Sequence, residues 1–542
     1  MNTPALIASV DELVAEFSAS AARSGPLAAL TTLVGRLREP MREPSVWAAV
    51  ADAMTRNGFG EPAAGVLASA LQHYPRNAEL HYLRGNALRV TRYFDEAEAD
   101  FRAALAQAPA HRQATLSLAY MLREQGRVNA AADVVLALGR AQAADTALAL
   151  TLLEFLRQSG AHAQARSLAD AARRHAPANA RLAALAGELA LALGDFAAAR
   201  ALLRQAVELE PEQSSAWLRL SYCGRCSDAN DPDLQLLRSA WADARLSPAT
   251  RVCAGFGAGK LLDDLDDYAA AAGVLRETNT LARSQSPWNA ESWQVLVESQ
   301  IARAPLPSLE PRADFVPVFV VGLPRSGTTL VASRLGRHAS VHDRGELNWV
   351  AAMYEHLSSQ NALANREALQ SVAKLIATQM RRDDAPARCY VDKNPLNFRY
   401  LNLILALFPN ARIVHCRRGA RDTALSLWSQ HFAHPDLAFS YDFSTIALVE
   451  QSCERLMAHW RSTLPSAAIL HVDYESLVTD PAAQLARIAE FCGVPGAETE
   501  DGSEVITTAS VWQARQPVYA RAVGRWRRYA EYVPELTQMF ES

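Results

Sequence analysis

The chain has 542 residues, of which 50% are apolar and 21% are charged, and this composition is typical of a globular protein with roughly two to four domains. The net charge of −4 gives no overall basic field, so nucleic acid is not expected as a partner. No apolar run reaches the about 18 residues of a membrane span, and the acidic N-terminal stretch around Asp11 and Glu12 does not resemble a secretory signal.

The N-terminal half is governed by a 34-residue period. Prolines recur in this register at Pro75, Pro109, Pro177 and Pro211, and alanines recur at Ala63, Ala97, Ala131, Ala165 and Ala199. This pattern resembles the tetratricopeptide repeat, in which each unit is a helical hairpin that buries its face against its neighbours. We expect a helical cap over 1–43 and a repeat solenoid over 44–302. The concave surface predicts a groove for a peptide or protein acceptor; the alternative is a scaffold or homodimer without a ligand.

The seven cysteines are scattered, which fits reduced thiols in a cytoplasmic protein. Cys223 and Cys226 form a single CxxC, and without a second close pair they predict ordinary thiols and no zinc site.

A change of pattern follows a proline-rich stretch, so 303–317 is the expected linker and 318–542 the second domain. Short apolar runs at 316–321, 389–391, 413–415 and 469–472 predict strands, and helical patterns separate them at 364–381, 421–431 and 445–463. Alternating strands and helices indicate a three-layer α/β domain with a parallel sheet. Ligands bind such sheets at the carboxyl ends of the strands.

The segment FVVGLPRSGTTL, Phe319 to Leu330, predicts a strand, a phosphate-binding turn and a helix. The spacing from Gly322 to Gly327 is that of a Walker A loop, but Thr328 stands where the Walker lysine is expected. An ordinary nucleoside triphosphate with magnesium is therefore not the expected ligand. The other three strands are followed by DKNP, CRRGARDTALS and DYESLV, so four segments converge on one crevice.

With the segment RGELN and the C-terminal VGRWRRY, these motifs resemble a sulfotransferase in order and spacing. The resemblance is to bacterial tetratricopeptide-repeat sulfotransferases and, over about 315–535, to tyrosylprotein sulfotransferases. It implies 3′-phosphoadenosine 5′-phosphosulfate as donor, 3′-phosphoadenosine 5′-phosphate as product, and no metal. The residues that it assigns to the donor are Arg325, Ser326, Gly327, Thr328, Thr329, Arg418, Ser426, Tyr474, Ser510, Arg515 and Arg525.

The resemblance also implies two catalytic residues. Lys393 would stabilise charge on the transferring group, and Glu346 would take the proton of the acceptor hydroxyl. The alternatives are a surface ion pair of Lys393 with Asp392 and a helix-start carboxylate for Glu346. Four histidines are rival bases that are expected to be structural: His338, His342, His431 and His434.

The expected function is transfer of a sulfuryl group to a hydroxyl, with a peptide tyrosine favoured and a carbohydrate or small phenol left open. Two alternatives belong to other classes: a P-loop phosphotransferase that uses ATP, and a repeat-based interaction scaffold with an inactive nucleotide-binding domain. Arg417 and Arg421 are expected to be solvated or paired with Asp422. The repeats are expected to add no residue to the nucleotide crevice.

Overall fold

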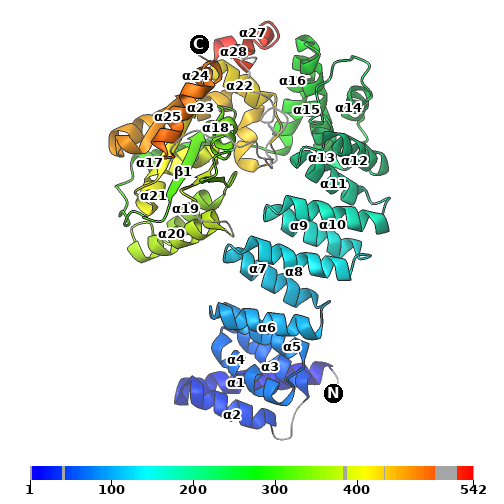
Figure 1. Cartoon of the computed structure of the whole chain (residues 1–542), viewed down its shortest axis with the longest axis vertical. Helices are drawn as coiled ribbons and strands as arrows, with labels where there is room; N and C mark the ends of the chain where they lie inside the picture. The colour runs from blue at the N-terminus through cyan, green and yellow to red at the C-terminus, as the bar shows by residue number, and fades with distance from the viewer. Residues whose placement is uncertain (1–2, 39–42, 383–386, 433, 495–521, 541–542) are drawn as a thin grey trace. The chain divides into compact units, whose positions relative to one another are not determined.

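The computed structural model describes residues 3–38, 43–382, 387–432, 434–494 and 522–540. The chain divides into two compact units, Met1–His175 and Ala176–Ser542, and each is described by itself (Figure 1).

The first unit is entirely helical over its described residues and consists of stacked hairpins, drawn from blue to cyan in Figure 1. Its helices are α1 (Thr3–Ser24), α2 (Pro26–Arg38), α3 (Pro44–Arg56), α4 (Gly60–His73), α5 (Ala78–Val90), α6 (Phe94–Gln107), α7 (Arg112–Glu124), α8 (Val128–Ala141), α9 (Thr146–Gln158) and α10 (His162–His175). The predicted repeat is confirmed, since from α3 on each 34-residue period forms one helical pair.

Local chemistry repeats with the same period. The first helix of successive hairpins is capped by the side chains of Asn77, His111 and Asp145, each of which accepts the backbone N–H three residues on. Tight packing within a hairpin requires a small residue, because a Cβ on Gly85 would lie 2.8 Å from the Phe101 ring. The recurring caps, and the small residues at close helix contacts, explain why the period is visible in the sequence.

The second unit begins with further helices of the same kind. They are α11 (Ala180–Ala192), α12 (Phe196–Leu209), α13 (Ser214–Leu220), α14 (Pro232–Ala242), α15 (Pro248–Asp264), α16 (Tyr268–Gln285) and α17 (Ala290–Ile301). Within this unit the last helices pack against the sheet-containing region: Asn279 donates to the carbonyl of Trp428 at 2.9 Å, and Phe256 stacks on His431 with 5.5 Å between ring centroids.

The sheet has five parallel strands in the order β2-β3-β1-β4-β5. The strands are β1 (Val316–Gly322), β2 (Val341–Asp343), β3 (Cys389–Asp392), β4 (Arg412–Arg417) and β5 (Ile469–Asp473). The four predicted strands and the parallel sheet are confirmed, whereas β2 was not predicted. Because all strands are parallel, their carboxyl ends lie along one edge of the sheet.

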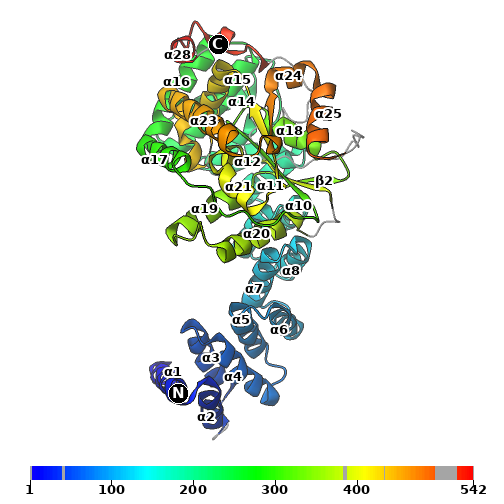
Figure 2. The same cartoon turned by 90° about the vertical axis from the view of Figure 1, so that its left-hand side faces the viewer.

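Helices cover both faces of the sheet. The helices that follow β1 in the chain are α18 (Thr328–Leu335), α19 (Trp349–Ser359), α20 (Arg366–Arg381), α21 (Leu401–Leu407), α22 (Ala420–Trp428), α23 (Phe443–Thr463), α24 (Tyr474–Thr479), α25 (Pro481–Phe491), α27 (Trp526–Tyr529) and α28 (Glu535–Gln538), with 3-10 turns η1 (Pro395–Tyr400), η2 (Pro435–Tyr441) and η3 (Ser466–Ala468). Figure 2 shows α18, α24 and α25 together on one side, where Val331, Leu477 and Ile488 join the valines of the strands in one core. On the other face, the Phe319 ring packs against Phe408. The predicted helix over 421–431 ends earlier, at Trp428.

Candidate active site

The loop after β1 has the backbone of a phosphate cradle. Gly322 and Gly327 have φ angles of +142° and +99°, and a Cβ on Gly322 would lie 2.3 Å from the carbonyl oxygen of Cys416. A Cβ on Gly327 would lie 2.7 Å from the Tyr474 ring. Arg325 also has a positive φ, +74°, a conformation that costs a non-glycine residue of order 1–3 kcal/mol and gathers at functional sites. α18 begins at Thr328, so its N-terminal N–H groups point into the loop.

Residues of the expected donor set meet around this loop. Arg325 Nε donates to Ser426 Oγ at 3.0 Å, and Arg418 Nη1 donates to the carbonyl of Arg325 at 3.1 Å. The Arg418 guanidinium lies 4.7 Å from the centre of the Tyr474 ring. Ser326 Oγ donates to the carbonyl of Leu323 at 2.7 Å, which fixes the turn. Segments that follow β1, β4 and β5 are thereby brought to one place.

Burial destabilises the charged forms of Arg325 and Arg418. Burial, together with the positive charges of Arg418 and Arg525, lowers the pKa of Arg325 to about 10, although Tyr222 and Tyr474 oppose the shift. Burial is also the main reason why the pKa of Arg418 is lowered, and Arg525 again adds to the effect. Like charges held together in partly dehydrated surroundings are relieved by an anion, so the arrangement fits a polyanionic ligand.

Arg525 reaches the cluster from the C-terminal segment but has its own partner. Its Nη2 lies 2.8 Å from Asp263 Oδ1, and Tyr529 Oη donates to the same oxygen at 2.7 Å. Burial acts to lower the pKa of Arg525, but Asp263 outweighs it and the pKa is raised. Because Asp263 belongs to α15, the helical region contacts one member of the expected donor set. The expectation that the repeats add no residue to the nucleotide crevice stays a prediction. Two other members of the expected donor set, Ser510 and Arg515, lie outside the described residues.

The two expected catalytic residues are in contact. Lys393 Nζ donates to Glu346 Oε1, although 47 positions separate them in the sequence. The Lys393 side chain is 3% exposed and that of Glu346 is 48% exposed, so a nearly buried ammonium is paired with a carboxylate that reaches solvent. The backbone N–H of Lys393 donates to the carbonyl of Gly345 at 2.8 Å, which keeps the two segments together.

The alternatives for these two residues do not match the contacts. Asp392 accepts from the N–H of Leu347 at 3.2 Å and from Asn397 at 3.1 Å, and it is not the ion-pair partner of Lys393. Burial raises the pKa of Asp392 to about 8. Glu346 precedes α19, whose N-cap is Asn348, and is therefore not a residue of the first helical turn.

The four histidines named as rival bases have other contacts. The His342 ring packs against Tyr390 in a tilted arrangement, His434 accepts from the N–H of Asp436, and His338 accepts from the N–H of Ser340. His431 packs between Phe256 and Tyr441, and burial lowers its pKa to about 4.

Arg417 and Arg421, which neighbour Arg418, do not contact Asp422. Asp422 accepts the backbone N–H groups of Gly524 and Trp526 at 2.6 and 2.9 Å and so holds the C-terminal segment. Arg417 pairs with Asp473, and Arg421 donates to the carbonyl of Phe540. Of the two expected alternatives, solvent exposure therefore holds for Arg417, whereas pairing of either arginine with Asp422 is wrong.

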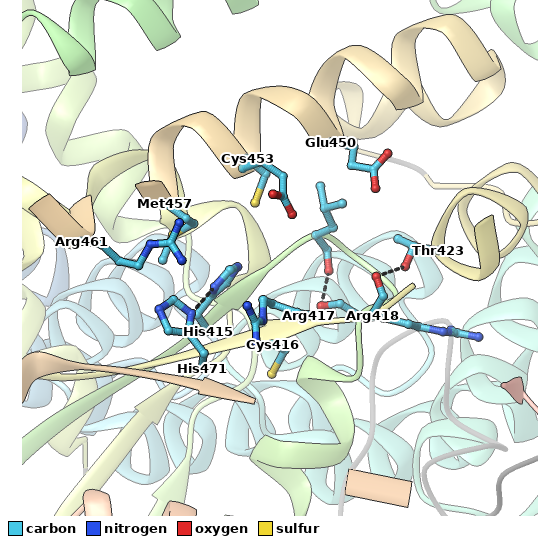
Figure 3. A pocket seen from close by; sticks show the side chains of 13 residues that line it. His415, Cys416, Arg417, Arg418, Thr423, Glu450, Cys453, Met457, Arg461 and His471 are labelled. Carbon is cyan, nitrogen blue, oxygen red and sulfur yellow. Dashed lines mark hydrogen bonds between the residues drawn. The ribbon is translucent and has the colours of Figure 1, made fainter. Parts of the chain in front are cut away.

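A small cavity of about 60 Å³ lies behind the loop, on the face of the sheet covered by α23 (Figure 3). Its wall includes Leu323 and Ser326 of the loop and a pair of histidines, His415 and His471, whose Nδ1 atoms are 2.9 Å apart. Burial, with His471 as the second cause, lowers the pKa of His415 to about 3. The volume suits a few water molecules and is too small for a nucleotide. The parallel sequences IVHC and ILHV, paired in register, could have indicated this contact.

Among the described residues, no group of three or more His, Cys, Asp or Glu side chains is arranged to hold a metal ion. Within the same ranges, no helix has the length and apolarity needed to cross a membrane.

Comparison with known proteins agrees with both halves of the chain. Residues 317–498 match the model of the sulfotransferase family, and residues 156–221 match a tetratricopeptide-repeat model. An uncharacterized protein of Aquifex aeolicus is 29% identical over 338 residues, which cover 58% of this chain and 44% of that protein. Protein-tyrosine sulfotransferase A of Caenorhabditis elegans is 28% identical over 192 residues, 33% of this chain and 50% of that protein.

The Drosophila melanogaster protein-tyrosine sulfotransferase is 26% identical over 190 residues, 33% of this chain and 38% of that protein. The chain thus spans half or less of the length of these relatives. Among solved structures, the sulfotransferase domain of the Synechococcus PCC 7002 olefin synthase is 20% identical with a TM-score of 0.31, covering 41% of this chain and 90% of that one. The chain thus combines a segment that matches the tetratricopeptide-repeat model with a C-terminal α/β segment that matches the model of the sulfotransferase family.

Proposed function

We propose that the chain transfers a sulfuryl group from 3′-phosphoadenosine 5′-phosphosulfate to a hydroxyl acceptor. The observation that carries the proposal is the group of Arg325, Arg418 and Ser426 around a glycine loop without a Walker lysine. This donor bears a phosphosulfate at one end and a 3′-phosphate at the other, and the site offers cationic and N–H donors for both.

The residues divide between the two ends of the donor. The loop residues Arg325 to Thr329 would hold the phosphosulfate, and Arg418 with Ser426 would hold the 3′-phosphate. The Tyr474 ring, which packs against Gly327 and Arg418, would border the adenosine. Arg525, Ser510 and Arg515 remain proposed donor residues of the C-terminal segment. Fixed cations can supply the charge stabilisation, so we propose that no metal is required.

Glu346 and Lys393 would perform the chemistry. Glu346 takes the proton of the acceptor hydroxyl as its oxygen forms a bond to sulfur. The bond from sulfur to the 5′-phosphate oxygen breaks, and Lys393 stabilises the negative charge that develops there. Lys393 must exchange its contact with Glu346 for a contact with the donor, which also frees the carboxylate to act as a base.

A tyrosine in a peptide is the favoured acceptor, supported by the glutamate base, by the relatives named protein-tyrosine sulfotransferases and by the repeats, whose groove we propose to hold the peptide. A carbohydrate or a small phenol is an alternative acceptor, and homodimerisation is an alternative role for the repeats. All seven cysteines are free thiols, which supports the proposed cytoplasmic location.

Thermal unfolding with 3′-phosphoadenosine 5′-phosphate in EDTA, with ATP and magnesium, and with buffer alone tests the donor. We expect a clear stabilisation by the first ligand only. Preferential stabilisation by ATP with magnesium would favour a phosphotransferase, and no response to either nucleotide would favour an inactive scaffold. Labelled donor with a tyrosine peptide, its phenylalanine analogue and a small phenol then tests the acceptor.

A further inference from the structure

Helix α15 ends beside Arg525, a proposed donor residue, and two side chains of the helical region lie next to the arginines of the proposed site. Asp263, the penultimate residue of α15, contacts Arg525 and Tyr529, and its side chain is 23% exposed. Tyr222, which follows α13, accepts a hydrogen bond from Gln430 and lies close enough to Arg325 to influence its pKa. The helical region thus supplies side chains that neighbour Arg525 and Arg325.

The C-terminal segment is held from two sides at this point. Asp422 of α22 fixes its backbone through Gly524 and Trp526, whereas Asp263 fixes the side chain of Arg525. The Tyr529 ring lies 5.4 Å from the Arg525 guanidinium and is itself fully buried. Arg525 is therefore oriented by a carboxylate, a hydroxyl and a ring that all belong to the folded protein and are present before any ligand binds.

Repulsion between neighbouring positive charges explains why Arg525 needs a carboxylate partner. Arg325, Arg418 and Arg525 repel one another, and Asp422 and Glu475 act mainly on Arg418. Without a carboxylate of its own, Arg525 would lower its energy by turning away from the other two guanidinium groups. A guanidinium has donors on more than one edge, so Asp263 can occupy one edge while another remains for a phosphate.

We infer that Asp263 is a positioning residue for the donor nucleotide, which makes the end of helix α15 a functional part of the sulfotransferase site. This inference rests on the proposed function. Asp263 acts by holding the Arg525 side chain in place. This reduces the conformational entropy that Arg525 would otherwise lose when the nucleotide binds.

The test is the affinity of the full chain for 3′-phosphoadenosine 5′-phosphate, measured by calorimetry for Asp263→Asn. We expect about tenfold weaker binding, and a raised KM for the donor with an unchanged KM for the acceptor. Asp266→Asn is the matched control, because Asp266 lies in the same turn, contacts Tyr268 and Arg528, and has a positive φ that asparagine tolerates. Its affinity should equal that of the unmodified protein.

The Arg525→Ala background separates positioning from a general loss of structure. If Asp263 acts through Arg525, adding Asp263→Asn to Arg525→Ala should weaken binding by less than twofold. Unchanged or tighter binding by Asp263→Asn would overturn the inference, as would a full tenfold effect in the Arg525→Ala background. Failure of the unmodified protein to bind this nucleotide would instead overturn the proposed function.

Discussion

Glu346→Gln should have opposite effects on donor binding and on turnover. In the free protein the nearly buried ammonium of Lys393 is held by Glu346, and a bound phosphosulfate must compete with that carboxylate. Exposed ion pairs contribute about 0.2–1 kcal/mol, and breaking a buried pair costs about 3–5 kcal/mol. With one partner 3% and the other 48% exposed, we place this pair at about 1–2 kcal/mol.

Removing the competing carboxylate should therefore tighten 3′-phosphoadenosine 5′-phosphate by about 5- to 30-fold. The same change removes the proposed base and should slow sulfuryl transfer by about 10²–10⁴-fold. Calorimetric titration gives the first quantity, and steady-state transfer to a tyrosine peptide gives the second.

Glu355→Gln is the control for charge alone, since Glu355 is an exposed residue of the nearby helix α19. Its affinity and turnover should both stay near those of the unmodified protein. Equal affinities of the two variants would refute the idea that Glu346 competes for Lys393. Nearly full turnover of Glu346→Gln would show that another group is the base.

Four further predictions concern Arg418, Lys393, His415 and the helices α11–α17. Arg418→Ala should weaken 3′-phosphoadenosine 5′-phosphate by about 2–4 kcal/mol and adenosine 5′-phosphosulfate much less, as measured by titration; equal losses would mean a structural role. Lys393→Ala should slow transfer to a peptide and to a small phenol by the same factor, whereas acceptor-dependent losses would contradict a donor-side role. The pKa of His415 is lowered to about 3 in the folded protein, whereas in the unfolded chain the imidazole binds a proton near pH 6.5. The free energy of unfolding should therefore fall as the pH drops below 6.5, because only the unfolded state is protonated. His415→Gln should remove about 2 kcal/mol of the loss between pH 7 and pH 5 in denaturant titrations, and an unchanged pH dependence would contradict the shift. A fragment that begins at Ala176, the start of the second unit, should bind the nucleotide. A fragment that begins at Arg303 lacks Asp263 and Tyr222, so it should bind more weakly or not fold. Equal binding by both fragments would show that α11–α17 are dispensable for nucleotide binding.

The features that could be predicted from the sequence are local ones. The 34-residue period is visible because several hairpins repeat a side-chain cap, as at Asn77, and a small residue at the close helix contact, as at Gly85. The glycine loop is visible because Gly322 and Gly327 occupy conformations and spaces that other residues fit poorly. Parallel strands place their carboxyl ends along one edge, so the polar motifs that follow them could be assigned to a common crevice.

Other features have no local pattern. Strand β2 has only three residues, too few to show a periodicity, and it joins the sheet through its pairing with β3. Pairing of Asp422 with a nearby arginine was one of two expected alternatives, but backbone N–H groups about a hundred positions away are its partners.

The sequence alone therefore determined the repeat, the α/β architecture and the residue types offered to an anionic donor, because each depends on spacing along the chain. Only the tertiary structure decided which charges meet. It joined Lys393 to Glu346 and Asp263 to Arg525, contacts that bring distant segments together through packing. The physical reason is that an ion pair between distant residues leaves no pattern in the sequence, because its two partners come together only when the chain folds.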